Sequence, residues 1–247
     1  MVRRDEILAY ANELLEVHRF PEFAPPGLQV VGADEVTKIA CGVSSSVELF
    51  ERAAAAGAQL LIVHHGLFWR NESPLVDRRQ RARLEALFRA DLTLAAYHLA
   101  LDAHPEIGNN ALLATRLGVE VERPFGEVGQ GGRLRQPCAA DEFAARVQEV
   151  VDRKPLVFAH GPQRVERVAI TSGGGGGELI RAAQEGYDLF LTGEPEEPSL
   201  HAARELGIHF VAGGHYATER LGVQALAERL SAKFGIEREF LEVPNPV

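Results

Sequence analysis

Residues 38–66 of the chain read KIACGVSSSVELFERAAAAGAQLLIVHHG, and this stretch decides the fold. An apolar run, a turn of small residues, a helical run and a second apolar run follow one another, which predicts a strand–helix–strand unit. The second strand ends in His64 and His65, whereas a strand buried on both faces ordinarily carries only Leu, Ile or Val. Two imidazoles at the end of a buried strand therefore indicate a functional site.

The alternation of strand and helix continues on both sides of this stretch. A first helix is expected within residues 1–18, which show rough helical periodicity. Strands and helices then alternate along the first half of the chain, at residues 36–43, 46–56, 59–63, 77–90, 92–99 and 109–117. Such alternation is typical of a largely parallel sheet covered by helices, so the sequence predicts the α/β class.

The second half of the sequence repeats the first. Residues 167–194, RVAITSGGGGGELIRAAQEGYDLFLTGE, align with the opening stretch without a gap, and Gly186 falls on Gly57. We infer an internal duplication that gives two similar α/β lobes, at residues 1–122 and 123–247. Ligands are expected in the cleft between two such lobes.

Histidines and carboxylates gather where the predicted strands end. Ligands of open α/β sheets bind at the carboxyl ends of the strands. Four groups fall there: His64 with His65, His98 with Asp102, Glu194, and His215 with Glu219. The second and fourth groups share an H-x-x-x-[D/E] spacing, which places both side chains on one face of a helical turn. Imidazole and carboxylate together suit Zn, Mn or Fe(II), so a metal site is predicted.

Other conspicuous stretches have structural explanations beside functional ones. The glycine run at residues 173–177 lacks the Lys-Ser/Thr of a phosphate loop; it either holds an anion on its amides or makes room in the cleft. Phe68 and Trp69 are interpreted as packing residues, with stacking on a heterocycle as the alternative. The remaining histidines are interpreted as hydrogen-bonded structural residues: His18, His104, His160, His201 and His209.

Composition narrows the class of protein. The formal net charge of −9 argues against general binding to nucleic acids, and no apolar stretch approaches the length of a membrane span. The chain has only two cysteines, Cys41 and Cys138, with no CxxC spacing. This usage argues against a disulfide framework or a thiolate zinc site and predicts a reducing, cytoplasmic location.

The segments IVHHGLFW, YHLALD, LTGE and GHYATE together resemble the family of NIF-three-like dinuclear metal proteins, whose bacterial members include GTP cyclohydrolase I type II homologues. The resemblance covers nearly the whole chain. It implies a two-lobed α/β fold, two divalent ions per chain (Zn, Fe, Mn or Mg) between the lobes, and a toroidal homohexamer. The implied metal ligands are His64, His65, Asp102, His215 and Glu219, with Glu219 bridging both ions.

Two further residues are candidates for catalytic roles. His98 fits the family motif, and we expect it to orient a bound water or substrate rather than to bind an ion. Glu194 lies at an equivalent strand end and is the second candidate.

Two hypotheses of function follow. The first is a metal-dependent hydrolase in which a water bridging two cations attacks a nucleotide or related heterocycle, as in GTP ring opening. The second is a non-catalytic, metal-binding hexameric scaffold or regulator. A catalyst needs an open coordination position, whereas a structural ion is fully coordinated.

Overall fold

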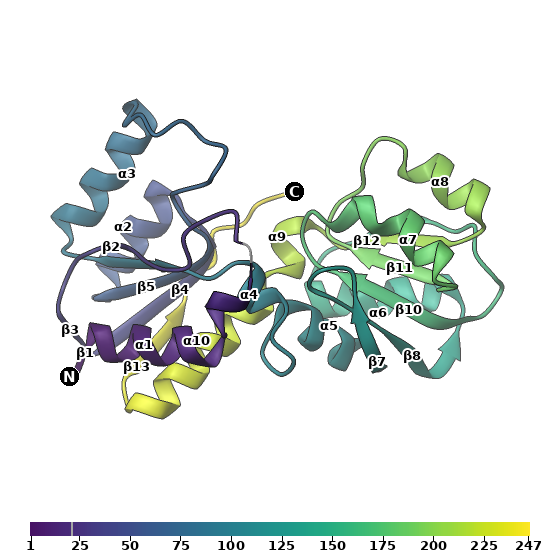
Figure 1. Cartoon of the computed structure of the whole chain (residues 1–247), viewed down its shortest axis with the longest axis horizontal. Coiled ribbons are helices and arrows are strands. Elements are labelled where there is room, and N and C mark those ends of the chain that lie inside the picture. The colour runs from purple at the N-terminus through teal and green to yellow at the C-terminus, as the bar shows by residue number, and fades with distance from the viewer. Residues whose placement is uncertain (21) are drawn as a thin grey trace. The chain divides into compact units, whose positions relative to one another are not determined.

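The computed structural model describes residues 1–20 and 22–247 and has a mixed α/β fold, which confirms the predicted class (Figure 1). Its contacts divide the chain into two compact units. The first comprises Met1–Leu101 and Gly222–Pro244, and the second comprises Asp102–Leu221 and Asn245–Val247. The chain passes between them within α4 and again within α10.

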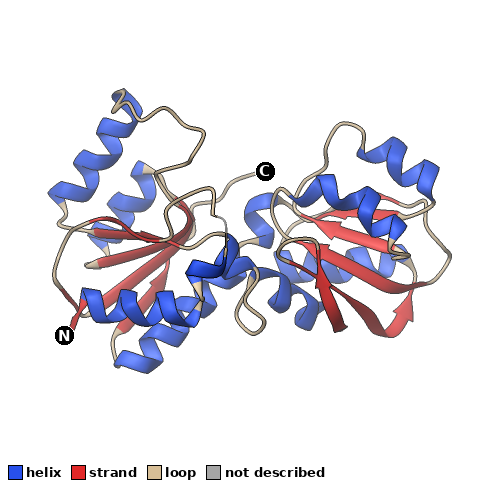
Figure 2. Ribbon diagram, in the orientation of Figure 1, coloured by secondary structure: helices blue, strands red, loops and turns tan. Residues whose placement is uncertain are grey.

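The first unit is built on a five-stranded sheet in the order β13-β4-β5-β6-β2. Strands β13, β4, β5 and β6 run parallel, and β2 is antiparallel to β6. Helices cover both faces of the sheet, α2 and α3 on one face and α1 and α10 on the other (Figure 2). The elements are β1 (Val2–Arg3), α1 (Arg4–Leu14), η1 (Val17–Arg19), β2 (Gly27–Val30), β3 (Glu35–Val36), β4 (Lys38–Ser44), α2 (Val47–Ala55), β5 (Leu60–His65), α3 (Arg78–Arg89), β6 (Thr93–Ala96), α4 (Leu99–Asp102), α10 (Arg220–Phe234) and β13 (Glu237–Phe240).

Local signals explain the elements of the opening stretch. The Ser46 hydroxyl accepts a hydrogen bond from the Leu49 N–H (3.1 Å) and so caps the start of α2. Gly57 follows that helix in the left-handed conformation (φ +72°), which glycine adopts without strain. Strand β6 is shorter than the predicted 92–99 because the chain turns after Ala96 and enters α4.

The second unit is built on a six-stranded sheet in the order β7-β8-β10-β11-β12-β9, in which β10, β11 and β12 run parallel. Helices α5 and α6 bury their apolar residues against one face, and α7 and α8 do so against the other (Figure 2). The elements are α5 (Asn109–Leu117), β7 (Val119–Phe125), β8 (Gly129–Cys138), α6 (Ala140–Val151), β9 (Leu156–Phe158), β10 (Val165–Thr171), η2 (Gly175–Glu178), α7 (Leu179–Gln184), β11 (Leu189–Thr192), α8 (Ser199–Leu206), β12 (His209–Ala212) and α9 (His215–Thr218).

The two units have a similar order of elements. Three parallel strands are neighbours in each sheet, β4-β5-β6 and β10-β11-β12, and a four-residue helix follows the third strand in both. The compact units nevertheless differ from the predicted lobes, residues 1–122 and 123–247. Helix α10 and strand β13 belong to the first unit because β13 pairs with β4, and α5 and β7 belong to the second.

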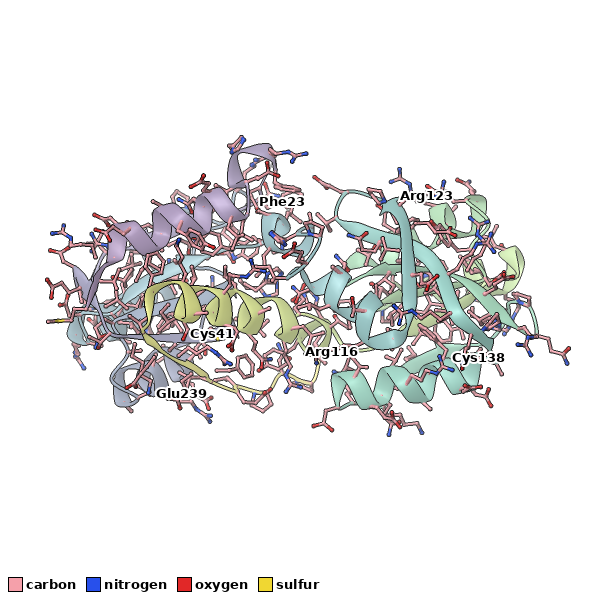
Figure 3. The ribbon with its side chains drawn as sticks, turned by 90° about the horizontal axis from the view of Figure 1, so that it is seen from below. Phe23, Cys41, Arg116, Arg123, Cys138 and Glu239 are labelled. Carbon is pink, nitrogen blue, oxygen red and sulfur yellow. The ribbon has the colours of Figure 1, made fainter. Side chains whose placement is uncertain are left out.

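Cys41 and Cys138 are both buried and free (Figure 3). Burial raises the pKa of the Cys41 thiol to about 12, so this cysteine is a protonated core residue. Within residues 1–20 and 22–247, no helix combines the length and the apolar character that crossing a membrane demands.

Candidate metal centre

Three histidines come together in the first unit. Strand β5 ends in His64 and His65, and His98 follows its parallel neighbour β6, so the carboxyl ends of two strands supply all three. One ring nitrogen from each lies within 4.8 Å of the others, close enough to hold a metal ion. We call His64, His65 and His98 the histidine cluster.

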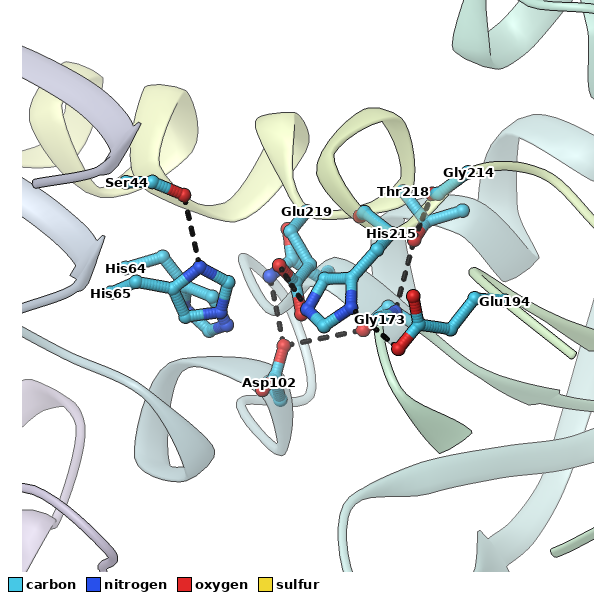
Figure 4. A network of polar contacts seen from close by, with 12 residues as sticks. Ser44, His64, His65, Asp102, Gly173, Glu194, Gly214, His215, Thr218 and Glu219 are labelled. Carbon is cyan, nitrogen blue, oxygen red and sulfur yellow. Dashed lines mark hydrogen bonds and ion pairs between the residues drawn. The ribbon is translucent and has the colours of Figure 1, made fainter. Parts of the chain in front are cut away.

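Hydrogen bonds orient two of these rings. His64 is fully buried, and its Nδ1 lies 2.9 Å from the carbonyl oxygen of Tyr97. Because a carbonyl only accepts, Nδ1 carries the proton and Nε2 carries the lone pair of the neutral ring. His65 Nδ1 lies 3.1 Å from the Ser44 hydroxyl oxygen (Figure 4). Metal-binding histidines are commonly oriented by such bonds at the second nitrogen.

Trp69 packs against this cluster. Its ring centroid lies 5.8 Å from that of His65 and 5.1 Å from that of His98, with the second pair edge-to-face. The indole Nε1 donates a hydrogen bond to the Gly66 carbonyl oxygen (3.3 Å). These contacts agree with the packing interpretation of Trp69.

Glu22 is a site residue that the sequence did not reveal. Its side chain is only 4% exposed, and its Oε2 lies 3.5 Å from His98 Nδ1. The same carboxylate accepts hydrogen bonds from the N–H groups of Leu99 (3.2 Å) and Ala100 (2.9 Å), at the start of α4. No motif marks Glu22, because it lies in an irregular segment far from His98 in the sequence.

We predict that Glu22→Ala lowers the free energy of unfolding by about 2 kcal/mol or more, because two buried N–H groups lose their acceptor. Glu22→Gln keeps one acceptor oxygen and should lose less. Urea unfolding of both variants measures the difference. Equal stability of the Ala variant and the parent protein would contradict the assigned role.

In the second unit, His215 lies between two carboxylates. It begins α9 directly after Gly214, and its Nε2 lies 3.3 Å from Glu219 Oε2 (Figure 4). Its Nδ1 lies 3.2 Å from Glu194 Oε1. The Glu219 side chain is 4% exposed and that of Glu194 is 38% exposed. The spacing of four residues thus joins His215 and Glu219 across one helical turn, as the sequence predicts.

These carboxylates control the charge of His215. Burial by itself lowers the pKa of the imidazole, but hydrogen bonds and charges from Glu219 and Glu194 outweigh it and raise the pKa to about 9. The ring of the metal-free protein is therefore protonated at neutral pH. An ion that binds this ring has to displace the proton.

We predict that NMR titration of the metal-free protein gives His215 a pKa of about 9, and that Glu194→Gln lowers it. Because the pKa is raised from 6.5, the ion pairs stabilise the fold fully below pH 6.5 and lose their effect as the pH rises through 9. Glu197→Gln removes an exposed carboxylate outside these pairs and serves as the control. An ordinary pKa in the parent protein would refute the prediction.

The glycine run makes room for this pair of side chains. Gly173 has a left-handed backbone (φ +61°), and a Cβ at this position would overlap Glu219 Oε1 and lie 3.2 Å from His215 Nε2. The Gly173 N–H donates to the Thr218 hydroxyl (3.0 Å), so this amide is already engaged. Of the two explanations for the run, space for side chains is the one that Gly173 fits.

We predict that Gly173→Ala destabilises the protein by about 1–2 kcal/mol through its left-handed backbone alone, with a further loss from the overlap with Glu219. It should also displace the Glu219 carboxylate and reduce metal uptake. Denaturant unfolding and metal analysis measure the two effects. Gly177→Ala is the matched control, because its Cβ would meet only the flexible end of Glu196 at 3.1 Å; equal effects of both variants would refute the prediction.

Asp102 is held by side chains of the second unit. It ends α4 and is 4% exposed, and its Oδ1 accepts hydrogen bonds from Asn109 Nδ2 (2.8 Å) and the Ser172 hydroxyl (3.3 Å). Asn110 donates to the Asp102 carbonyl oxygen (3.4 Å) and accepts from the Ser172 N–H (2.7 Å). No motif in the sequence marks these three partners, although two adjacent asparagines at the start of a buried helix are a visible signal.

One of the histidines interpreted as structural shows that role clearly. His209 Nδ1 accepts a hydrogen bond from the Gly161 N–H (3.1 Å), and its Nε2 lies 2.8 Å from the Pro162 carbonyl oxygen. Both nitrogens are thus used within the fold.

The residues present fit divalent ions. Histidine nitrogens and carboxylate oxygens form a donor set that accepts Zn, Mn or Fe. The His64 tautomer leaves the Nε2 lone pair to act as a ligand, and the backbone of Gly173 clears the space that Glu219 and His215 occupy. In each unit the candidate ligands come from the ends of parallel strands and the turns that follow.

The fold and the histidine cluster define an α/β protein with a group of side chains that could hold a metal ion. The chain belongs to the Duf34/NIF3 (NGG1p interacting factor 3) family, whose profile matches residues 2–246. The family membership inferred from the motifs is thereby confirmed.

Individual relatives are similar over their whole length. A protein of Neisseria meningitidis serogroup A named GTP cyclohydrolase 1 type 2 homolog is 44% identical over 248 residues, covering 100% of both chains. Among solved structures, protein ybgI, described as of unknown function, superimposes with a TM-score of 0.97 at 42% identity and covers 100% of both chains. TTHA1606 from Thermus thermophilus does so with a TM-score of 0.93 at 37% identity, again over 100% of both.

Proposed function

We propose that this protein binds two divalent ions and acts as a metal-dependent hydrolase on a nucleotide or related heterocycle. The proposal rests mainly on how the fold holds the candidate metal ligands in position. His64 is fixed by a backbone carbonyl in the tautomer that can bind an ion, and Glu219 lies buried beside His215 in space that Gly173 leaves open. The name of the Neisseria relative supports a GTP cyclohydrolase-like reaction.

In this proposal both units contribute ligands. His64 and His215 would hold one ion, His65 and Asp102 would hold the other, and Glu219 would serve both. The positions of two ligands in the sequence support the assignment, because each lies close to a point where the chain crosses from one unit to the other. Asp102 is the first residue of the second unit, and Glu219 comes shortly before the return after Leu221.

When bound, paired divalent ions lower the pKa of a coordinated water toward neutrality and stabilise the negative charge that develops in hydrolysis. The chain itself supplies groups that orient and move protons. Glu22 lies against Nδ1 of His98, so Nε2 is the atom of that ring placed to take a proton from water or substrate. Glu194 keeps His215 in place through its Nδ1, while its own side chain remains 38% exposed.

Further properties follow from the family resemblance. We propose a cytoplasmic homohexamer with Zn, Fe, Mn or Mg as the ions. A non-catalytic metal-binding scaffold or regulator is the alternative that the experiments below distinguish.

We predict that purified protein holds close to two ions per chain, and that His65→Ala and Glu219→Ala each reduce this content while the far-UV circular dichroism is retained. The reason is that each variant removes a ligand without disturbing the sheet. His201→Ala, an exposed histidine on α8, is the control. Elemental analysis after exchange into metal-free buffer provides the measurement.

Catalysis is tested with the same variants. Metal-loaded protein should turn over at least one member of a nucleotide panel, and a chelator or Glu219→Gln should remove the activity. His98→Ala should keep both ions and lose turnover; loss of the ions from this variant would contradict the ligand assignment. A broad panel without any turnover would favour the scaffold alternative.

A further inference from the structure

The second unit contains a cavity of about 460 Å³ beside the turn that carries His215. Its lining includes Arg153, Lys154, Gly193, Glu194 and Gly214. The volume lies within the range of roughly 300–1,000 Å³ that is usual for small-molecule sites. We call it the anion cavity, because Arg153 and Lys154 in its lining are positively charged.

The end of α6 and the backbone of Gly214 position Arg153 in the lining of this cavity. It follows α6, whose last turn ends at Asp152 in the left-handed conformation (φ 54°). Its guanidinium lies against Gly214, where a Cβ would approach Nη1 to 2.9 Å. Nη1 is buried and has no hydrogen-bond partner within the described part of the chain. Because a buried donor is costly without an acceptor, the guanidinium is suited to a bound anion.

The charges around the cavity favour an anion as well. Within residues 1–20 and 22–247, neither Arg153 nor the exposed Lys154 beside it forms an ion pair. The lining contains two carboxylates: that of Glu194, which pairs with His215 at 3.2 Å, and the terminal carboxylate of Val247, where an oxygen accepts a hydrogen bond from the Tyr216 N–H (3.1 Å). Because Glu194 is paired with His215, the two positive charges of Arg153 and Lys154 face only the terminal carboxylate, which leaves a net positive charge in a chain whose formal net charge is −9.

We propose that the anion cavity binds the phosphate group of a small organophosphate, with Arg153 and Lys154 holding the phosphoryl oxygens. A planar guanidinium can donate two parallel hydrogen bonds to such a group, and the adjacent ammonium matches a second negative charge. Glu194 lines the cavity and also pairs with His215, so the cavity adjoins this histidine. Calling the organophosphate a substrate rests on the proposed function, whereas the binding of phosphate does not.

The test uses the full chain after removal of metal ions by a chelator, so that phosphate cannot bind through an ion. Inorganic phosphate is titrated into the protein and followed by calorimetry. The parent protein should bind phosphate, and Arg153→Met and Lys154→Met should each weaken binding about tenfold or more, as expected for loss of a charge-assisted hydrogen bond. Arg135→Met is the matched control, because Arg135 is 69% exposed and pairs with Glu120 outside the cavity.

Several outcomes would overturn the assignment. These are the absence of phosphate binding to the parent protein, undiminished binding by Lys154→Met, or tighter binding of succinate than of phosphate. Lys154 is exposed, so its variant keeps the test valid even where Arg153→Met fails to fold. Ion content is measured on a separate portion of the same protein before the chelator is added, and it separates the proposals: phosphate binding by a protein that holds no ions contradicts the metal site alone, and ion binding without phosphate binding contradicts the cavity alone.

Discussion

The register of the parallel strands is the constraint on which the histidine cluster depends. Strand β5 lies between β4 and β6, and its pairing places Ser44 opposite His65 and Val63 opposite Ala96. The first pairing brings the Ser44 hydroxyl to His65 Nδ1, and the second brings the carbonyl that follows β6 to His64 Nδ1. A shift of one residue would turn each side chain to the opposite face of the sheet, so both rings would lose their partners. The register that buries the apolar strand is therefore also the register that orients His64 and His65.

The second unit uses the same scaffold differently. In the aligned sequences, Gly173 falls on Ser44 and Gly193 on His64. The Gly193 N–H donates to the Gly173 carbonyl (3.0 Å), and the Gly214 N–H donates to the Gly193 carbonyl (2.7 Å). The strand ends of this unit thus carry no side chains at these positions, and the candidate ligands come from the turn that follows. The two units thus share a topology but place different residues at the equivalent strand ends, with glycine in the second unit where the first has the candidate ligand His64.

Local patterns predicted the parts of the molecule that local forces determine. The helix at residues 109–117 was predicted with its observed bounds, and the H-x-x-x-E spacing joined His215 to Glu219. Glu22 and the addition of β13 to the first sheet depend on contacts between distant residues, which no period in the sequence encodes. Strand β13 has the short polar sequence EREF, and only its pairing with residues 38–41 gives it a place in the sheet. The positions of Glu22 and β13 therefore depend on long-range contacts, which the periodicity of the sequence does not reveal.

The charges in the second unit explain why its candidate ligands favour a cation. Glu219 and Asp102 are buried carboxylates, and a buried negative charge is costly unless hydrogen bonds or a positive charge compensate it. Asp102 is compensated by Asn109 and Ser172, whereas Glu219 has the protonated ring of His215 against it. The same carboxylates that raise the pKa of His215 to about 9 would attract a divalent ion to the same place. In the metal-free protein the proton on His215 thus occupies the role that a metal ion is expected to take.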